Sequence, residues 1–225
     1  MCDILTAMAT VNGAVVFKVL IDIFCLSVVA GEPFHRGFYC DDESLMHPHK
    51  PDTVPTWVAS TVAIVLPLIF IVLIEGHQLS IFRRNCSCYS ISQSRPYLIT
   101  LYRSIGSFFF GAAVTQLTTD VAKYSIGRLR PHFLTLLSFP SGHTSITVYS
   151  MVFIIIFLQI KIKWRKSWLL RPFIQAILFY MTYLTSLSRI TDYMHHWSDV
   201  LGGAIIGLTE SGSKDAGIEI HFLLL

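Results

Sequence analysis

The chain has 225 residues, of which 53% are hydrophobic and only 14% are charged, and its mean hydropathy is +0.58. A soluble domain carries about a quarter charged residues, so the composition excludes an ordinary soluble protein. The formal net charge of +3 at pH 7 says little by itself. We therefore predict an all-α fold, a polytopic transmembrane helix bundle.

Five apolar stretches approach the length of a membrane span, which needs roughly 20 apolar residues. In chain order they cover residues 11–30, 57–74, 105–121, 146–160 and 173–187. A further stretch, residues 200–208, is too short to span. We predict five spans and a shortened sixth segment.

Basic residues predict the orientation of the bundle. They gather between the second and third stretches and again between the fourth and fifth: Arg83, Arg84, Arg95 and Arg103, then Lys161, Lys163, Arg165, Lys166 and Arg171. Cytoplasmic loops carry an excess of Lys and Arg. The other connections then lie on the opposite, exoplasmic face, to which the third, fourth and fifth helices deliver three separate segments.

The first of these segments is KYSIGRLRP, residues 123–131. Lys123 and Arg130 are two helical turns apart, so they share a face if the helix continues to Pro131. We expect both to bind an anion and Arg128 to be an interface anchor. The alternative is that all three cations are snorkelling anchors.

The second segment is SFPSGHTS, directly before an apolar run. Pro140, Ser141 and Gly142 predict a helix start, where free backbone N–H groups and the positive end of the dipole favour anions. His143 then lies in the first turn and faces whatever binds. A plain helix start with a surface histidine is the alternative.

The third segment is SRITDYMHHWSDV, residues 188–200. Arg189 offers a guanidinium suited to phosphate oxygens. His195 and Asp199 are four residues apart, so on a helix the carboxylate can accept a hydrogen bond from Nδ1 and leave Nε2 unprotonated. We expect the adjacent His196 to point to another side of the helix. The side chains expected to be solvated loop residues are Asp192, His35, His47 and His49.

Together the three segments predict a phosphotransfer site. Three cations can neutralise a phosphate, a helix N-terminus can hold its oxygens, and two histidines offer a nucleophile and an acid. A zinc site on His195, His196 and Asp199 is the competing interpretation. We rank it lower because adjacent histidines of a regular helix cannot face one metal.

The chain resembles the lipid phosphate phosphatase family (phosphatidic acid phosphatase type 2), animal type. The motifs K-x6-RP, PSGH and SR-x5-H-x3-D read here as residues 123–131, 140–143 and 188–199, in the same order and without substitution. The loop PFHRGFYCDDESL, residues 33–45, also resembles the first extracellular loop of the animal members. The similarity extends from about residue 17 to residue 208.

The resemblance implies a phosphatidate phosphatase that hydrolyses phosphatidic acid, lysophosphatidic acid, ceramide-1-phosphate or sphingosine-1-phosphate without magnesium. His195 would be the nucleophile, oriented by Asp199, and His143 would protonate the leaving alkoxide. The phosphate would be bound by Lys123, Arg130, Ser141, Gly142 and Arg189. No cofactor, metal or nucleic acid is implied.

The resemblance also implies a multi-pass protein of the plasma membrane or endoplasmic reticulum, with the active site on the extracellular or lumenal side. Homo- or hetero-oligomers with family members are left open. Residues 132–139 are shorter than the family's loop, and residues 209–225 do not resemble family sequence. We therefore predict a membrane-embedded domain over 1–208, an atypical tail over 209–225, and a truncated or alternatively spliced form.

Two alternatives to a lipid phosphatase stay open. One is a catalytically weak or inactive chain that binds lipid phosphates or acts as a regulatory membrane partner. The other is a phosphatase of soluble substrates, of the glucose-6-phosphatase kind.

Overall fold

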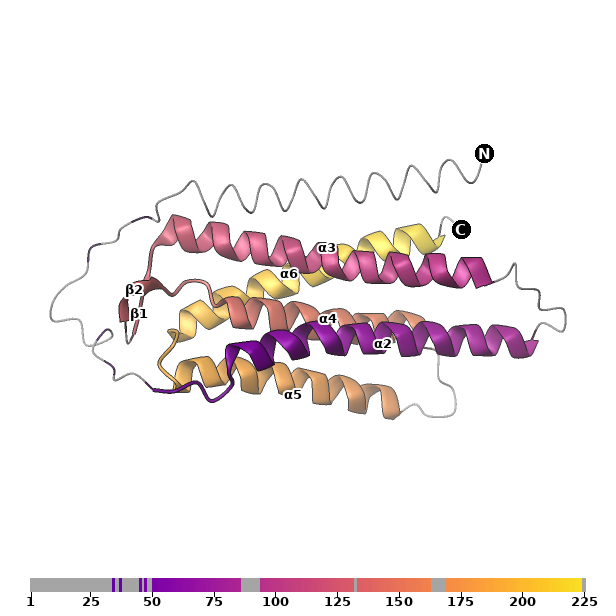
Figure 1. Cartoon of the computed structure of the whole chain (residues 1–225), viewed down its shortest axis with the longest axis horizontal. Helices are drawn as coiled ribbons and strands as arrows, with labels where there is room; N and C mark the ends of the chain where they lie inside the picture. The colour runs from indigo at the N-terminus through magenta and orange to yellow at the C-terminus, as the bar shows by residue number, and fades with distance from the viewer. Residues whose placement is uncertain are drawn as a thin grey trace.

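The computed structural model describes residues 34, 37, 45, 47, 50–85, 94–131, 133–162 and 169–223. Five long helices run along one common direction, with a small strand pair at one end (Figure 1). The helices are α2 (Thr56–Asn85), α3 (Ser94–Ile126), α4 (Gly142–Lys161), α5 (Leu170–Thr191) and α6 (Trp197–Leu223). The strands β1 (Leu129–Arg130) and β2 (Phe133–Leu137) are antiparallel.

The predicted membrane helix bundle is confirmed. In the described part of the chain, α2, α3 and α4 are long and apolar enough to cross a membrane, and each contains one predicted span. The span predicted over 173–187 lies in α5, which has 22 residues but is not among these three. The span predicted over 11–30 lies outside the described residues.

The sixth segment is longer than the apolar stretch that predicted it. Helix α6 has 27 residues, because its backbone remains helical through the polar residues that follow Leu208. The boundary proposed at residues 208 and 209 therefore does not coincide with a helix end. The division into a domain and a tail stays a prediction.

Helix α4 forms the centre of the bundle. In its apolar window 61% is buried, against 28% in α2 and 22% in α3. Aromatic rings of α3 and α4 make up much of the core, where Phe108 stacks with Tyr149 and meets Phe153 edge-on. The Tyr149 hydroxyl donates to the Phe108 carbonyl at 2.9 Å.

Helix α6 packs closely on α4 at two glycines. A Cβ atom at Gly203 would lie 2.5 Å from the Ser141 carbonyl oxygen, and one at Gly207 would lie 2.6 Å from that of Ser145. Small residues four apart allow this approach of two membrane helices. The contact holds the start of α6 against the start of α4, which is the end of the bundle that carries the predicted motifs.

Candidate active site

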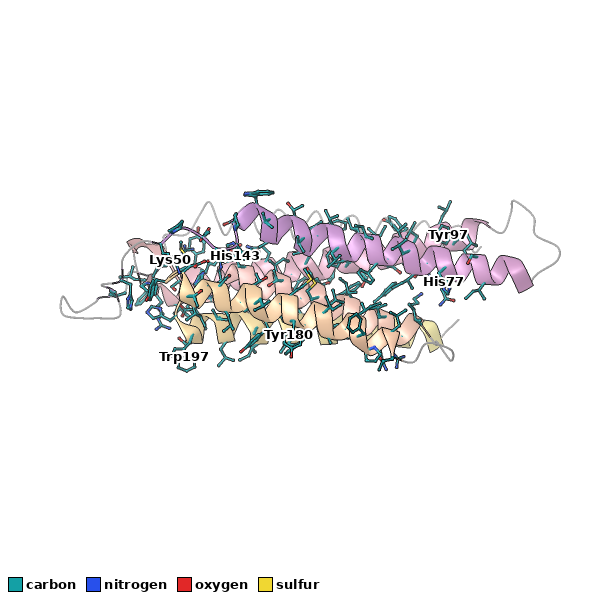
Figure 2. All side chains as sticks on the ribbon, turned by 90° about the horizontal axis from the view of Figure 1, so that it is seen from below. Lys50, His77, Tyr97, His143, Tyr180 and Trp197 are labelled. Atoms are coloured by element: carbon teal, nitrogen blue, oxygen red, sulfur yellow. The ribbon has the colours of Figure 1, made fainter. Side chains whose placement is uncertain are left out.

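A cavity of about 240 Å³ lies at the end of the bundle beside the strand pair. His143 and Lys50 lie at this end, and His77 and Tyr97 lie at the other (Figure 2). Five of the eight predicted site residues line the cavity: Lys123, Arg130, Gly142, His143 and His195. The remaining lining residues are Thr56, Ala59, Ser60, Gln116 and Ile146.

Lys123 lies in the last turn of α3 and reaches the start of α4. Its Nζ is 3.1 Å from Asp120 Oδ1. A Cβ atom at Gly142 would lie only 3.2 Å from the same Nζ, tighter than ordinary contact. The absence of a side chain at Gly142 therefore lets the ammonium approach the N-terminus of α4.

Arg130 lines the cavity from a strand and not from a helix. Helix α3 ends at Ile126, and Gly127 follows with φ +59° and donates its N–H to the Lys123 carbonyl at 3.1 Å. Glycine adopts this left-handed conformation without steric cost and so terminates the helix. The helix therefore does not continue to Pro131, which was the condition for a shared helical face of Lys123 and Arg130: Arg130 lies on β1.

Helix α4 begins at Gly142 with Ser141 as its N-cap, as its sequence predicted. Ser141 is fully buried, and its hydroxyl accepts a hydrogen bond from Thr144 Oγ1 at 3.1 Å. The first N–H groups of a helix have no partner within the helix. His143 follows in the first turn, and its buried Nε2 atom has no hydrogen-bond partner among the described residues.

Arg189, in the last turn of α5, is only 2% exposed and does not line the cavity. Its guanidinium donates to the Val54 carbonyl at 2.7 Å and to Asp52 Oδ1 at 3.3 Å. The segment that precedes α2 thus holds this cation. A role for Arg189 in phosphate binding stays a prediction.

His195 lies between α5 and α6, not on a helix as predicted. Its Nδ1 atom is 4.0 Å from Asp199 Oδ2, too far for the expected hydrogen bond. The closer group is the Ser138 hydroxyl, at 3.3 Å from Nδ1.

The electrostatic surroundings keep His195 neutral. Burial, followed by the positive charge of Arg130, lowers the pKa of His195 to about 3. The Asp199 carboxylate and a hydrogen bond to the Ser138 main chain act in the opposite direction. At neutral pH the imidazole is therefore a base with a free lone pair.

Asp199 lies in the first turn of α6 and is fully buried. It accepts hydrogen bonds from the Ser138 hydroxyl and from the His196 N–H at 2.9 Å, the latter closing the start of the helix as in a capping box. The His196 Nδ1 atom is 3.2 Å from Oδ2, so the expectation that His196 points elsewhere was wrong. Arg128 donates to Oδ1 at 2.7 Å and is not the predicted interface anchor.

Asp192 is another residue that sequence reasoning placed wrongly. It is fully buried rather than solvated, and it accepts hydrogen bonds from Thr53 N at 2.7 Å and Thr53 Oγ1 at 2.6 Å. Burial alone would raise the pKa of Asp192, but these bonds and the charges of Arg189 and Lys50 lower it overall. His47 is an exposed loop residue as expected, and its ring stacks on Tyr193 with ring centroids 4.4 Å apart.

His35 and His49 lie outside the described residues. Within the described part of the chain, no group of three or more His, Cys, Asp and Glu side chains is arranged to hold a metal ion.

Comparisons with known proteins agree on one family. The model of the PAP2 superfamily matches residues 104–210, a range that contains all the predicted site residues. A protein of Drosophila melanogaster named putative phosphatidate phosphatase is 38% identical, over 81% of this chain and 61% of its own length. No solved structure matches the chain.

Two mammalian proteins are matched over more of their length. Phospholipid phosphatase 1 of Rattus norvegicus is 38% identical over 84% of this chain and 80% of that protein. Phospholipid phosphatase 2 of Homo sapiens is 35% identical over 84% of this chain and 78% of that protein. The chain therefore belongs to the lipid phosphate phosphatase family of the PAP2 superfamily, a family of phosphatase enzymes.

Proposed function

We propose that the chain hydrolyses phosphate monoesters of lipids in the cavity beside the strand pair. The substrates we propose are phosphatidic acid, lysophosphatidic acid, ceramide-1-phosphate and sphingosine-1-phosphate. One observation carries the proposal: five residues from three separate motifs line a single cavity. The names of the relatives, phosphatidate and phospholipid phosphatases, agree with this substrate class.

The charges around the cavity suit a phosphate group. Lys123 and Arg130 both line it, and the N-terminus of α4 adds the positive end of a helix dipole. Backbone N–H groups at such a terminus are a natural anion site. Donors that are fixed before the reaction stabilise the charge that develops in the transition state. We propose that they act without magnesium.

The two histidines of the cavity supply the covalent chemistry. We propose that the neutral imidazole of His195 attacks phosphorus, forming an N–P bond while the bond from phosphorus to the lipid oxygen breaks. His143 gives a proton to that oxygen, and its unpartnered Nε2 atom is the group available for this. A water molecule then attacks the phosphohistidine, His143 takes its proton, and the N–P bond breaks to release inorganic phosphate.

The surroundings of the cavity fit a substrate that stays in the bilayer. The outer faces of the helices carry large exposed hydrophobic side chains, among them Leu73, Phe173 and Leu184. Acyl chains can remain in lipid while the headgroup reaches the end of the bundle. Arg171 lies in the first turn of α5 and Arg103 in the N-terminal half of α3, whereas the cavity lies at the C-terminal ends of these two helices. By the positive-inside rule we propose that the cavity faces the extracellular or lumenal side.

The decisive experiment is phosphate release from phosphatidic acid in detergent micelles with EDTA present. We expect release by the wild-type chain, loss of release in His195→Ala, and retention in His77→Ala, which removes an exposed histidine at the far end of the bundle. Release that requires a divalent metal, or that survives in His195→Ala, would contradict the proposal.

Two further arms separate the alternatives. Glucose-6-phosphate in place of phosphatidic acid tests for a phosphatase of soluble substrates, and we expect slower release from it. Vanadate, a phosphate mimic, tests binding through its protection against thermal unfolding. A chain that binds vanadate and releases no phosphate from either ester would be a binding or regulatory protein.

A further inference from the structure

Ser138 is the residue that the predicted mechanism leaves without a role although it lies inside the site. It follows β2, is fully buried, and donates its N–H to the Arg128 carbonyl at 2.7 Å. The pairing of Leu129 with Leu137 fixes its position at the end of the hairpin. A rigid main chain thus presents its hydroxyl to the interior.

The Ser138 hydroxyl lies between His195 and Asp199, which we had expected to hydrogen-bond to each other directly. It donates to Asp199 Oδ2 and is 3.3 Å from His195 Nδ1. The two partners themselves are 4.0 Å apart at their closest nitrogen and oxygen. At this distance the carboxylate does not accept a hydrogen bond directly from the imidazole.

Counting protons gives the direction of each bond. Asp199 pairs with Arg128 at 2.7 Å, and an ionised carboxylate only accepts hydrogen bonds. Ser138 has one hydroxyl proton and gives it to this carboxylate, so its oxygen can only accept from His195. The Nδ1 atom must then carry the proton of the neutral ring. Its Nε2 atom is left with a lone pair.

We propose that Ser138 is a positioning residue, whose hydroxyl links Asp199 to His195 Nδ1 and holds the imidazole ready to attack through Nε2. The inference rests on the proposed function, since it concerns the nucleophile of that reaction. When Nε2 forms its bond to phosphorus, the ring becomes a cation that keeps its proton on Nδ1. Ser138 then transmits the negative charge of Asp199 to that cation.

The Asp199 carboxylate also accepts hydrogen bonds from other donors. Arg128 is bound to Oδ1, while the main chain and ring of His196 are within 3.2 Å of Oδ2. These contacts fix the carboxylate in place. Among the described residues, the Ser138 hydroxyl is then the group that contacts both this carboxylate and His195 Nδ1.

The first test compares Ser138→Ala with Ser138→Thr and with Ser150→Ala. Ser150 is a fully buried serine of α4 outside the site, and its hydroxyl has no partner among the described residues. We expect Ser138→Ala to lower kcat on phosphatidic acid by about tenfold to a hundredfold, the scale on which a small misplacement of a reacting group acts. KM and vanadate affinity should change by less than about threefold, because the cavity cations are intact.

The second test is a double-mutant cycle with Asp199→Asn, which distinguishes a relay from a merely structural serine. If the carboxylate acts through the hydroxyl, the effects of the two substitutions on kcat are not additive. Adding Asp199→Asn to the Ser138→Ala chain then lowers kcat little further. A double variant whose fold-loss in kcat equals the product of the two single fold-losses would overturn the proposal. So would a kcat within twofold of wild type in Ser138→Ala.

The conservative variant keeps the test decisive if Ser138→Ala fails to fold. Ser138→Thr retains the hydroxyl, and we expect it to bind vanadate and keep at least about a tenth of the wild-type kcat. A folded, vanadate-binding Ser138→Thr chain without activity would overturn the proposal. Failure of the proposed function itself looks different, because the His195→Ala chain would then release phosphate as fast as wild type.

Discussion

The two ends of the bundle both bury charged side chains, but they use them differently. At the end away from the strand pair, Glu75 is 4% exposed and lies 3.0 Å from Lys161 Nζ. Ser104 donates to the same carboxylate at 3.1 Å, and the ammonium lies 5.7 Å from the centre of the Phe157 ring. These charges are satisfied by one another and by their neighbours.

The site end contains satisfied charges as well, since Asp192 and Asp199 each have several partners. What distinguishes it is a cavity bordered by Lys123 and Arg130 and by a histidine nitrogen without a partner. A buried polar atom left unpaired costs about 1–3 kcal/mol. A buried charge alone therefore does not indicate a site. A cation or a base that borders an empty space does.

The largest expected effect follows from removing a cavity cation. We expect Arg130→Gln to lower kcat/KM for phosphatidic acid by about a hundredfold to a thousandfold, because a fixed donor to the transition state is worth this much. Its thermal stability should stay the same or rise. Arg171→Gln, which removes a guanidinium at the far end, is the control and should keep its activity within twofold. Equal losses in both variants would erase the proposed difference between the two ends.

The far end should respond in stability and not in rate. Glu75→Gln removes the negative charge from the ion pair of Glu75 with Lys161, and breaking a buried pair costs roughly 3–5 kcal/mol. We expect a clear fall in melting temperature in detergent, with kcat per folded molecule within twofold of wild type. Replacing both residues with methionine should recover much of the stability. A loss of kcat without a loss of stability would mean that this pair communicates with the cavity.

A smaller effect should appear in the pH dependence of stability. The pKa of His195 is 6.5 in its ordinary state and about 3 in the folded chain, chiefly through burial. Between these values the unfolded chain binds a proton that the folded chain does not, so stability falls as the pH falls below 6.5. The contribution is at most about 1.4 kcal/mol for each pH unit. We expect His195→Gln to lose less stability than wild type between pH 7 and pH 5.

Much of the fold and of the candidate site could be predicted from the sequence, because both rest on local signals. Apolar length predicted the helices, and Pro140 with Ser141 and Gly142 predicted where α4 begins. The three motifs also predicted which side chains would share a surface, and five of these line one cavity. The chemical roles of those residues stay predictions.

The parts that could not be predicted depend on partners far away in the chain. Asp192 has the polarity of a loop residue, and only the fold brings Thr53, 139 positions away, to its carboxylate. Arg128 looks like an interface anchor until the hairpin turns it towards Asp199. A spacing of four suggested a helical hydrogen bond from His195, but α6 begins only at Trp197. Gly127 was the one local signal that could have placed Arg130 correctly, because glycine ends helices.

The smallest expected effect concerns Asp52, whose carboxylate interacts with the charges of Arg189 and Arg130. It is 3.3 Å from Arg189 and is 29% exposed. Burial lowers the pKa of Arg130, and the charge of Asp52 is the largest influence that raises it. The carboxylate therefore offsets part of the positive potential that a phosphate would meet. An interaction at such a partly exposed position is worth about 1 kcal/mol.

We accordingly expect Asp52→Asn to strengthen inhibition by vanadate about threefold to fivefold, measured as its inhibition constant against phosphatidic acid. Asp52→Glu, which keeps the charge, should change it less. Weaker inhibition in Asp52→Asn would mean that holding the Arg189 guanidinium in place matters more than the repulsion of the anion. In that case the segment before α2 would be part of the phosphate site.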